Sequence, residues 1–258
     1  MEFDGETKPQ RKTMSSQKVI DQIMTAGDEL ADSLDKLKFK SPVAVTYNPY
    51  RYAKESLRIY IEKFAGSEKT ILFMGMNPGP WGMAQTGIPF GEVTAVTNWM
   101  GIKTNVKKPE TEHPKRIVDG FECKRSEVSG RRLWNLFAQR FKTAQSFFID
   151  HFVVNYCPLM FMEESGRNLP PDKLPAHEAK PLQDICDRHL RALTKALKPD
   201  WVIGIGVYAE NRALAALGNG QRCGRILHPS PANPQANAGW AERATAQLEG
   251  MGAWNGLI

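Results

Sequence analysis

Three polar residues of this chain each follow an apolar run and lie close to a proline. They stand in the segments Asn77-Pro78-Gly79-Pro80, Asn155-Tyr156-Cys157-Pro158 and His228-Pro229-Ser230-Pro231. A side-chain amide offers a hydrogen-bond donor and an acceptor together. The carboxyl ends of parallel strands meet at one edge of a sheet, which is where open α/β folds bind ligands. We therefore expect one site there, built from two amides and one imidazole on loops that the prolines stiffen.

The chain lacks the groups that several other chemistries need. No lysine lies in the loop after Asn77, so Schiff-base chemistry is not expected from it. No pair of carboxylates is placed for ordinary glycoside hydrolysis, and the nearest acid, Glu92, is interpreted as structural. The four cysteines form no C-x-x-C pair, and the histidines show no metal-ligand spacing. We therefore expect no cofactor and no metal.

Continuous apolar runs precede the three loops, which is typical of strands buried on both faces. The expected strands are residues 70–76, 146–154, 200–207 and 225–227, with a short extended run at 43–45. Helical patterns are expected at residues 15–37, 51–64, 130–141, 180–197, 209–217 and 240–248. Apolar strands that alternate with helices predict an α/β sandwich with a mostly parallel sheet.

The domain organisation is expected to be simple. Residues 1–12 are polar and charged and are predicted to be a disordered tail, followed by a single domain over residues 13–258. Residues 103–125 are polar and are predicted to form a loop. No apolar run approaches the ~20 residues that span a bilayer. The acidic N-terminal segment is wrong for a secretory signal, so we expect an intracellular protein with no membrane contact.

The composition is compatible with a nucleic-acid partner but does not require one. The 258 residues include 34 Lys and Arg against 28 Asp and Glu, which gives a net charge of +6. The hydrophobic share of 41% excludes a wholly disordered or collagen-like chain. A basic balance favours a polyanionic partner, and ordinary solubility explains it equally well. The same two interpretations stay open for the basic residues Lys107, Lys108, Lys115, Arg116, Lys124, Arg125, Arg131 and Arg132.

A further glycine pattern, Gly204-Ile205-Gly206-Val207-Tyr208-Ala209, fits G-x-G-x-x-A after a strand and hints at a dinucleotide fold. That fold also needs an acidic residue at a second strand end about 20 positions later, and none stands there. We interpret the pattern as a close helix–strand turn and do not expect NAD to bind.

Residues 75–93 have the sequence GMNPGPWGMAQTGIPFGEV, and residues 228–240 have the sequence HPSPANPQANAGW. These segments resemble the two motifs of the single-strand-selective monofunctional uracil-DNA glycosylases. Residues 155–159 and 165–169 also match that family in order, and the resemblance covers roughly residues 40–250. It implies a three-layer sandwich with a central, mostly parallel four-stranded sheet flanked by helices.

The resemblance implies catalytic roles for two residues and a recognition role for a third. Asn77 matches the residue that holds the attacking water, and His228 matches the residue that donates a hydrogen bond to uracil O2. Asn155 matches the residue that reads the edge of the base, where an amide offers donor and acceptor together. The target base must be flipped out of the DNA stack to reach such a site.

The resemblance also implies substrate-binding roles for Met76, Gly79 and Phe90. Phe90 matches the ring that stacks on the flipped base, a contact worth ~1–3 kcal/mol in nucleic-acid systems. Gly79 leaves space beside C5 of the pyrimidine, so a 5-oxidised uracil such as 5-hydroxymethyluracil is expected to fit.

The second motif implies a DNA-binding loop made of Ser230, Pro231, Ala232 and Asn233. The family usually carries an arginine at the position of Ala232, where it wedges into the space left by the flipped base. The alanine here predicts a weaker invasion of double-stranded DNA.

The implied activity is hydrolysis of the N-glycosidic bond of uracil and 5-oxidised uracils in single- or double-stranded DNA, as a step of base excision repair. The implied enzyme is a monomer, located in the nucleus of a eukaryote or in the cytoplasm, at the nucleoid, of a bacterium. One alternative is a non-catalytic module that binds single-stranded or damaged DNA. Another is a small-molecule nucleosidase, which the basic balance disfavours.

Overall fold

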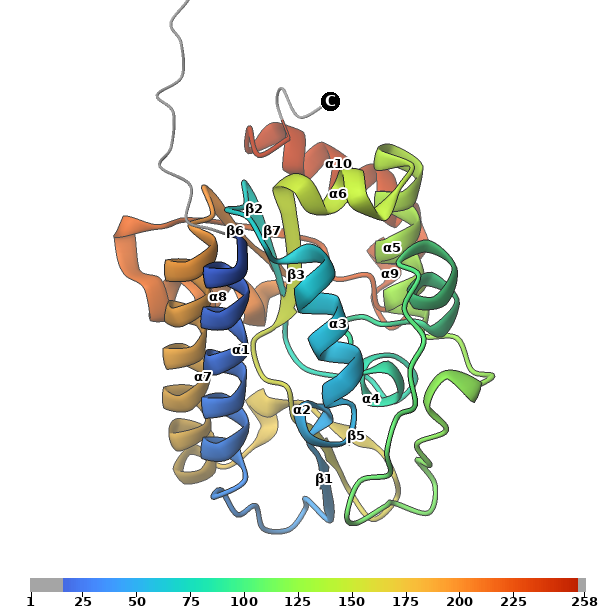
Figure 1. The fold of residues 1–258 in the computed structure, drawn as a ribbon. Helices are drawn as coiled ribbons and strands as arrows, with labels where there is room; N and C mark the ends of the chain where they lie inside the picture. The colour runs from blue at the N-terminus through green and yellow to red at the C-terminus, as the bar shows by residue number, and fades with distance from the viewer. Residues whose placement is uncertain (1–15, 255–258) are drawn as a thin grey trace, which may run out of the picture.

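The computed structural model describes residues 16–254 (Figure 1). Its strands are β1 (Val45–Tyr47), β2 (Ile71–Gly75), β3 (His151–Asn155), β4 (Met160–Met162), β5 (Asn168–Leu169), β6 (Trp201–Ile205) and β7 (Arg222–Ile226). Its α-helices are α1 (Ser16–Leu34), α2 (Pro49–Tyr52), α3 (Lys54–Phe64), α4 (Met83–Thr86), α5 (Val128–Phe141), α6 (Ala144–Asp150), α7 (Ala176–Leu197), α8 (Val207–Leu217), α9 (Pro234–Asn237) and α10 (Trp240–Gly250). Short 3₁₀ or π turns lie at η1 (Ala95–Trp99), η2 (Gly120–Glu122), η3 (Pro171–Lys173) and η4 (Gly218–Gly220).

The central sheet has four strands in the order β3-β2-β6-β7, and every neighbouring pair is parallel. Strands β2 and β3 are buried along their whole length, which explains their continuous apolar sequence. Gly75 pairs with Asn155 and Ile205 pairs with Ile226, so neighbouring strands end at nearly the same level. The predicted four-stranded parallel sheet is confirmed.

Helices cover the sheet in two layers. Helices α1, α7 and α8 lie on one side of it in Figure 1, and α5, α6 and α10 lie on the other. Helix α1 packs along α7, and α8 packs on β6. The face of α1 that meets its neighbours carries Val19, Ile23, Leu30 and Leu34, each at most 3% exposed. This arrangement is the predicted three-layer sandwich.

A second, small antiparallel sheet in the order β1-β4-β5 was not predicted. Its strands have only two or three residues, too few for a visible alternation of apolar and polar positions. Tyr47 pairs with Met160, and this sheet positions the chain that follows β3.

Several predicted elements were wrong in their extent: β1 covers residues 45–47 rather than 43–45, α7 begins at Ala176 rather than at residue 180, and β7 covers residues 222–226 rather than 225–227. The strand expected over residues 146–154 begins only at His151, because α6 precedes it, with the Thr143 side chain accepting a hydrogen bond from the Ser146 amide (3.1 Å). Ile149 in α6 is 64% exposed. Because this surface residue is apolar, the sequences of α6 and β3 look like one continuous apolar strand. The helix expected over 51–64 is interrupted at Ala53, which separates α2 from α3.

The remaining predictions have mixed outcomes. Helix α1 ends at Leu34 rather than at residue 37, and residues 103–125 form the expected loop apart from η2. The predicted tail of residues 1–12 lies outside the described residues, and the single-domain organisation stays a prediction. Between residues 16 and 254, no helix has the length and apolarity needed to cross a membrane.

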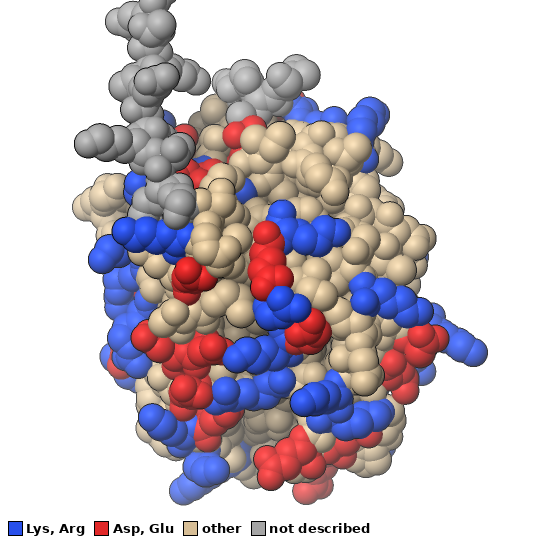
Figure 2. Space-filling view, viewed as in Figure 1, with Lys and Arg blue, Asp and Glu red and all other residues tan. Residues whose placement is uncertain are grey.

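The surface in Figure 2 carries basic and acidic side chains interspersed rather than one basic patch. Many of them form exposed ion pairs, such as Arg58 with Glu55 and Glu62. Such pairs contribute little to stability, typically below about 1 kcal/mol each. The net positive charge therefore does not by itself mark a binding face on this side of the molecule.

Candidate active site

The loops after β2, β3 and β7 meet at the carboxyl edge of the parallel sheet and enclose a pocket of about 140 Å³. Its lining comprises Met76, Asn77, Pro78, Gly79, Phe90, Glu127, Ser129, Asn155, Asn168 and His228. A cavity of this size is comparable with one known to take up a single benzene ring. The predicted convergence of Asn77, Asn155 and His228 is confirmed, and the pocket has room for one flat ring.

Backbone hydrogen bonds fix the loop that carries Asn77. The amides of Tyr156 and Cys157 donate to the carbonyls of Gly75 and Met76, both at 2.9 Å. The Asn77 Nδ2 then donates to the Leu159 carbonyl (3.2 Å). Because Nδ2 is engaged, Oδ1 is the atom of this side chain that is left to accept a hydrogen bond in the pocket.

Asn155 is 6% exposed and has one unsatisfied atom. Its Nδ2 contacts Met83 Sδ (3.1 Å), a weak acceptor, whereas its buried Oδ1 has no hydrogen-bond partner. A buried acceptor without a partner costs about 1–3 kcal/mol. A ligand with an N–H group next to a carbonyl group would satisfy both atoms of this amide.

Phe90 forms a wall of the pocket and has an uncommon backbone conformation. It is 7% exposed, has φ of 53°, and its ring centroid lies 6.3 Å from that of His228. Its carbonyl accepts a hydrogen bond from Trp134 Nε1 (2.9 Å), which holds the conformation. A Cβ atom at Gly75 would lie 2.5 Å from both the Phe90 ring and Asn155 Oδ1, so glycine there lets both side chains reach the pocket.

His228 is held as a neutral hydrogen-bond donor. Its Nδ1 accepts from the Ser230 amide (3.1 Å), so the neutral ring carries its proton on Nε2. Burial lowers the pKa of His228 to about 4, which keeps the ring neutral at physiological pH. Gly206, with φ of 96°, starts α8 beside this ring, and a Cβ atom there would lie 3.2 Å from the His228 Cβ.

Sequence reasoning missed three residues of the lining: Glu127, Ser129 and Asn168. Glu127 precedes α5, and its buried Oε2 has no partner and lies 2.7 Å from where a Gly79 Cβ would stand. Burial, reinforced by nearby Glu92, raises the pKa of Glu127 to about 7. Asn168 also has a buried, unpartnered Oδ1. Asn168 lies in residues 165–169, which match the family, and this match could have identified it as a site residue. Glu127 lies in none of the matching segments, so nothing in the sequence indicated its role.

The loop predicted to bind DNA is shaped by hydrogen bonds within itself. Pro231 and Ala232 are exposed, the Ser230 Oγ accepts from the Ala232 amide (3.2 Å), and Asn233 Oδ1 caps α9. From α5, Arg132 donates to the Pro229 carbonyl (3.0 Å). The loop is therefore a preformed projection beside His228.

Other predicted features have structural places. Glu92 is 5% exposed, and its Oε2 accepts from the Ala95 amide (3.0 Å), in keeping with the structural role expected of it. A Cβ atom at Gly204 would lie 2.3 Å from the Glu210 amide nitrogen, which confirms the close helix–strand turn. In the range 16–254, no three His, Cys, Asp or Glu side chains are grouped as a metal site requires.

Comparisons with known proteins agree with this geometry. Residues 62–248 match the family model of the Uracil DNA glycosylase superfamily. The single-strand selective monofunctional uracil-DNA glycosylase of Rattus norvegicus is 48% identical over 85% of this chain and 80% of that protein. The Bos taurus protein of the same description is 45% identical over 86% of this chain and 83% of its own. The crystal structure of Pedobacter heparinus SMUG2 superimposes with a TM-score of 0.62 at 15% identity, covering 89% of this chain and 98% of that one.

Proposed function

The chain belongs to the single-strand-selective monofunctional uracil-DNA glycosylases of the uracil DNA glycosylase superfamily, and we propose that the pocket at the carboxyl edge of its sheet is where the base is cleaved from DNA. The protein is an N-glycosylase of DNA repair that hydrolyses the bond between uracil and deoxyribose. Its substrate is uracil-containing DNA.

The base is bound as a flipped, extrahelical ring. The pocket of about 140 Å³ suits one pyrimidine, with Phe90 stacked on its face and Met76 among the residues that line it. Asn155 reads the uracil edge: its orphaned Oδ1 accepts from N3–H while Nδ2 donates to O4. Gly79 faces C5 beside the Glu127 carboxyl, and the absence of a side chain at Gly79 leaves room for 5-oxidised uracils such as 5-hydroxymethyluracil.

Cleavage breaks the C1′–N1 bond, and the bonding electron pair leaves with uracil as an anion. Positive charge develops on the sugar and negative charge on uracil O2. His228 donates a hydrogen bond from Nε2 to that oxygen, and it does so as a neutral ring because its pKa lies near 4. Asn77 Oδ1 accepts a hydrogen bond from the water that attacks C1′, and that water releases one proton to solvent.

An amide is a poor base, so Asn77 contributes orientation rather than proton abstraction. The water adds after the glycosidic bond has largely broken, when the sugar carbon is strongly electrophilic. The sequence of steps needs neither a cofactor nor a metal.

The loop of Ser230, Pro231, Ala232 and Asn233 contacts the DNA strands around the extruded nucleotide, both in single-stranded and in double-stranded substrates. The enzyme acts as a monomer on DNA. We place it in the nucleus, on the ground that its mammalian relatives are DNA repair glycosylases.

The observation that carries this mechanism is the unpartnered Asn155 Oδ1 in a ring-sized pocket shared with Asn77 and His228. A labelled single-stranded oligonucleotide with one uracil tests it. The strand should stay intact after incubation and break at the uracil only after alkali. A non-catalytic DNA-binding module would give no break, and a nucleosidase would instead release uracil from free deoxyuridine.

A further inference from the structure

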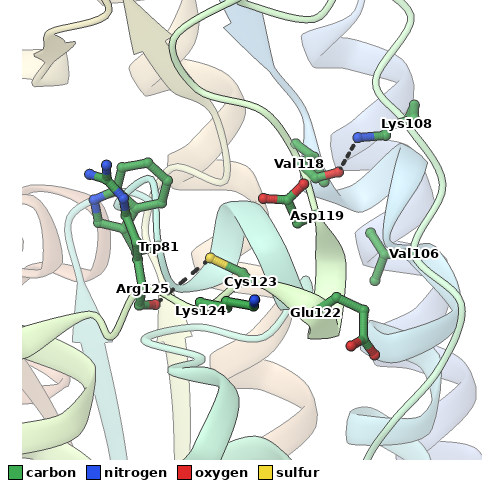
Figure 3. A pocket seen from close by; sticks show the side chains of 9 residues that line it. All are labelled: Trp81, Val106, Lys108, Val118, Asp119, Glu122, Cys123, Lys124 and Arg125. Atoms are coloured by element: carbon green, nitrogen blue, oxygen red, sulfur yellow. Dashed lines mark hydrogen bonds between the residues drawn. The ribbon is translucent and has the colours of Figure 1, made fainter.

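A wider groove of about 590 Å³ (Figure 3) is lined in part by residues that neighbour those of the active-site pocket along the chain. Figure 3 shows Trp81 and Arg125 together on one side of the groove, and Val118, Asp119 and Glu122 on the other. Trp81 follows the pocket residue Gly79 by two positions, and Arg125 precedes the pocket residue Glu127 by two. The side of the groove formed by Trp81 and Arg125 is therefore close along the chain to two residues of the pocket.

The buried side chain of Gln85, 1% exposed, joins the two walls. Its Nε2 donates to the Pro80 and Ile117 carbonyls, both at 3.0 Å. Its Oε1 accepts from the amides of Asp119 (2.8 Å) and Gly120 (3.1 Å). These four hydrogen bonds fix the shape of the groove, because they hold the loop before α4 against the polar 103–125 segment.

Arginine side chains stack on the Trp81 ring. Figure 3 shows the Arg125 guanidinium beside the Trp81 ring. It lies 4.5 Å from the ring centroid, and the Arg116 guanidinium lies 5.4 Å from the same centroid. Cation–π stacking holds the face of a guanidinium and leaves its N–H edges free. Those edges suit the paired oxygens of a phosphate.

The charges around the groove favour an anion. Among the described residues, no carboxylate forms an ion pair with Lys124 or Arg125. Of the acidic lining residues, Glu122 pairs with Lys103 (3.1 Å), and Asp119 is exposed. Lys108 is already engaged by Glu112 (3.1 Å) and by the Val118 carbonyl. Around the groove, the positive charges of Arg116, Lys124 and Arg125 therefore outnumber the single negative charge of Asp119.

We propose that this groove binds the phosphodiester backbone of the uracil-bearing strand, one or two nucleotides from the extruded base, with Arg125 held against Trp81 as the principal phosphate contact and Lys124 as the second. The proposal rests on the proposed function, because it takes the neighbouring pocket as the base site. The groove gives affinity on one flank of the uracil, and it takes no part in breaking the glycosidic bond.

Trimming the substrate tests the proposal. Single-stranded oligonucleotides carry one uracil, and nucleotides are removed from the 5′ side in one series and from the 3′ side in the other. For the unmodified protein, the half-saturating DNA concentration should rise sharply in one series once the first two flanking nucleotides are gone. The maximal single-turnover rate should stay constant as long as the DNA saturates the enzyme.

The double variant Lys124→Gln/Arg125→Gln should raise the half-saturating concentration about tenfold for long substrates and leave the trimmed ones unchanged. It should also flatten the slope of log affinity against log salt by about 0.7–1.4, as expected for one or two phosphates on a single strand. The double variant Arg188→Gln/Lys195→Gln on α7 removes the same charge from exposed positions and serves as the control.

Trp81→Leu tests the stacking itself. If the indole acts by holding Arg125, then Trp81→Leu/Arg125→Gln should bind no more weakly than Arg125→Gln alone. The proposal is overturned if the groove variant loses equal affinity for all lengths, or if it matches the α7 control. An unmodified protein that excises no uracil at any length would instead overturn the proposed function, so the two failures are distinguishable.

Discussion

Two histidines with lowered pKa values stand at opposite ends of the same parallel sheet, and they differ in how their ring nitrogens are used. His151 opens β3 at the amino end, and His228 follows β7 at the carboxyl end. Burial lowers the pKa of each to about 4. His151 uses both ring nitrogens, with the Phe147 carbonyl (2.9 Å) and Trp254 Nε1 (3.2 Å). His228 uses Nδ1 alone, and its Nε2 is left for a ligand.

This comparison separates a structural group from a functional one where the pKa alone does not. The amino end of the sheet is closed by satisfied hydrogen bonds. The carboxyl end keeps unpartnered atoms at Asn155, Asn168 and Glu127. Unsatisfied polar atoms that surround one pocket are costly to the fold, and a ligand that pairs with them offsets that cost.

The largest expected effect comes from deleting the groups assigned to the transition state. His228→Leu should slow single-turnover excision roughly 100–1000-fold, because one donor to a developing oxyanion is worth about 3–4 kcal/mol. Asn77→Ala should cost two or more decades in the same rate while the affinity for uracil-DNA stays nearly constant. His151→Leu is the matched control, and its rate at a temperature where it is folded should equal that of the unmodified protein. A His228→Leu protein with an unchanged rate would refute the distinction between the two ends.

The second prediction concerns Glu127 at the carboxyl end. Its native pKa of about 7 lies above the value of 4.5 for an unperturbed glutamate, so its stabilising contribution is complete below pH 4.5 and is lost as the pH rises through 7. The loss amounts to about 3 kcal/mol at most. Glu127→Gln should therefore gain stability relative to the unmodified protein between pH 5 and 8, as measured by urea unfolding. Glu164→Gln, at an exposed position, should show no such trend.

The third prediction concerns His151 at the amino end, with the opposite sign. Its native pKa lies below the unfolded value of 6.5, so its contribution is complete above pH 6.5 and is lost as the pH falls towards 4. His151→Leu should lower the free energy of unfolding at pH 7 by about 1–3 kcal/mol, since Trp254 Nε1 loses its acceptor. That deficit should shrink by roughly 2 kcal/mol at pH 5. A deficit independent of pH would mean that the ring is not kept neutral by the fold.

The smallest effect is expected at Ala232, on the exposed loop beside His228. Its methyl group cannot fill the gap left by an extruded nucleotide, so excision should favour single-stranded or mispaired uracil over U·A pairs. Ala232→Arg should tighten binding to abasic duplex about three- to tenfold, with little gain on single strands. Repeating the measurement at high salt separates a wedge from a general attraction to phosphates. An equal gain on both DNA forms would mean that Ala232 is not the wedge position.

The sequence predicted the architecture because the deciding signals are local. The apolar run of β2 ends in a proline-rich loop, and parallel strands force such ends together, so Asn77 and Asn155 could be placed before any coordinates. Ile149 misled the strand prediction because an exposed apolar residue in a short helix looks like part of a buried run. Glu127 could not be found, because its importance arises from the tertiary approach of α5 to Gly79 and has no counterpart in its neighbours along the chain.

The hydrogen bonds that anchor the 103–125 segment also define where this protein would tolerate engineering. Glu112 accepts from both Lys108 Nζ (3.1 Å) and the Val118 amide (2.8 Å), which draws the two sides of a tip together. Within that tip, Glu110 and Thr111 are exposed. Among the described residues, neither side chain forms a hydrogen bond with another part of the fold. Insertion succeeds best at exposed loop tips whose ends are already close. A fluorescent domain inserted between Glu110 and Thr111 would lie outside the segment that Gln85 holds in place. The insertion would therefore give a fluorescent form of the enzyme without any change to the loops of the active site.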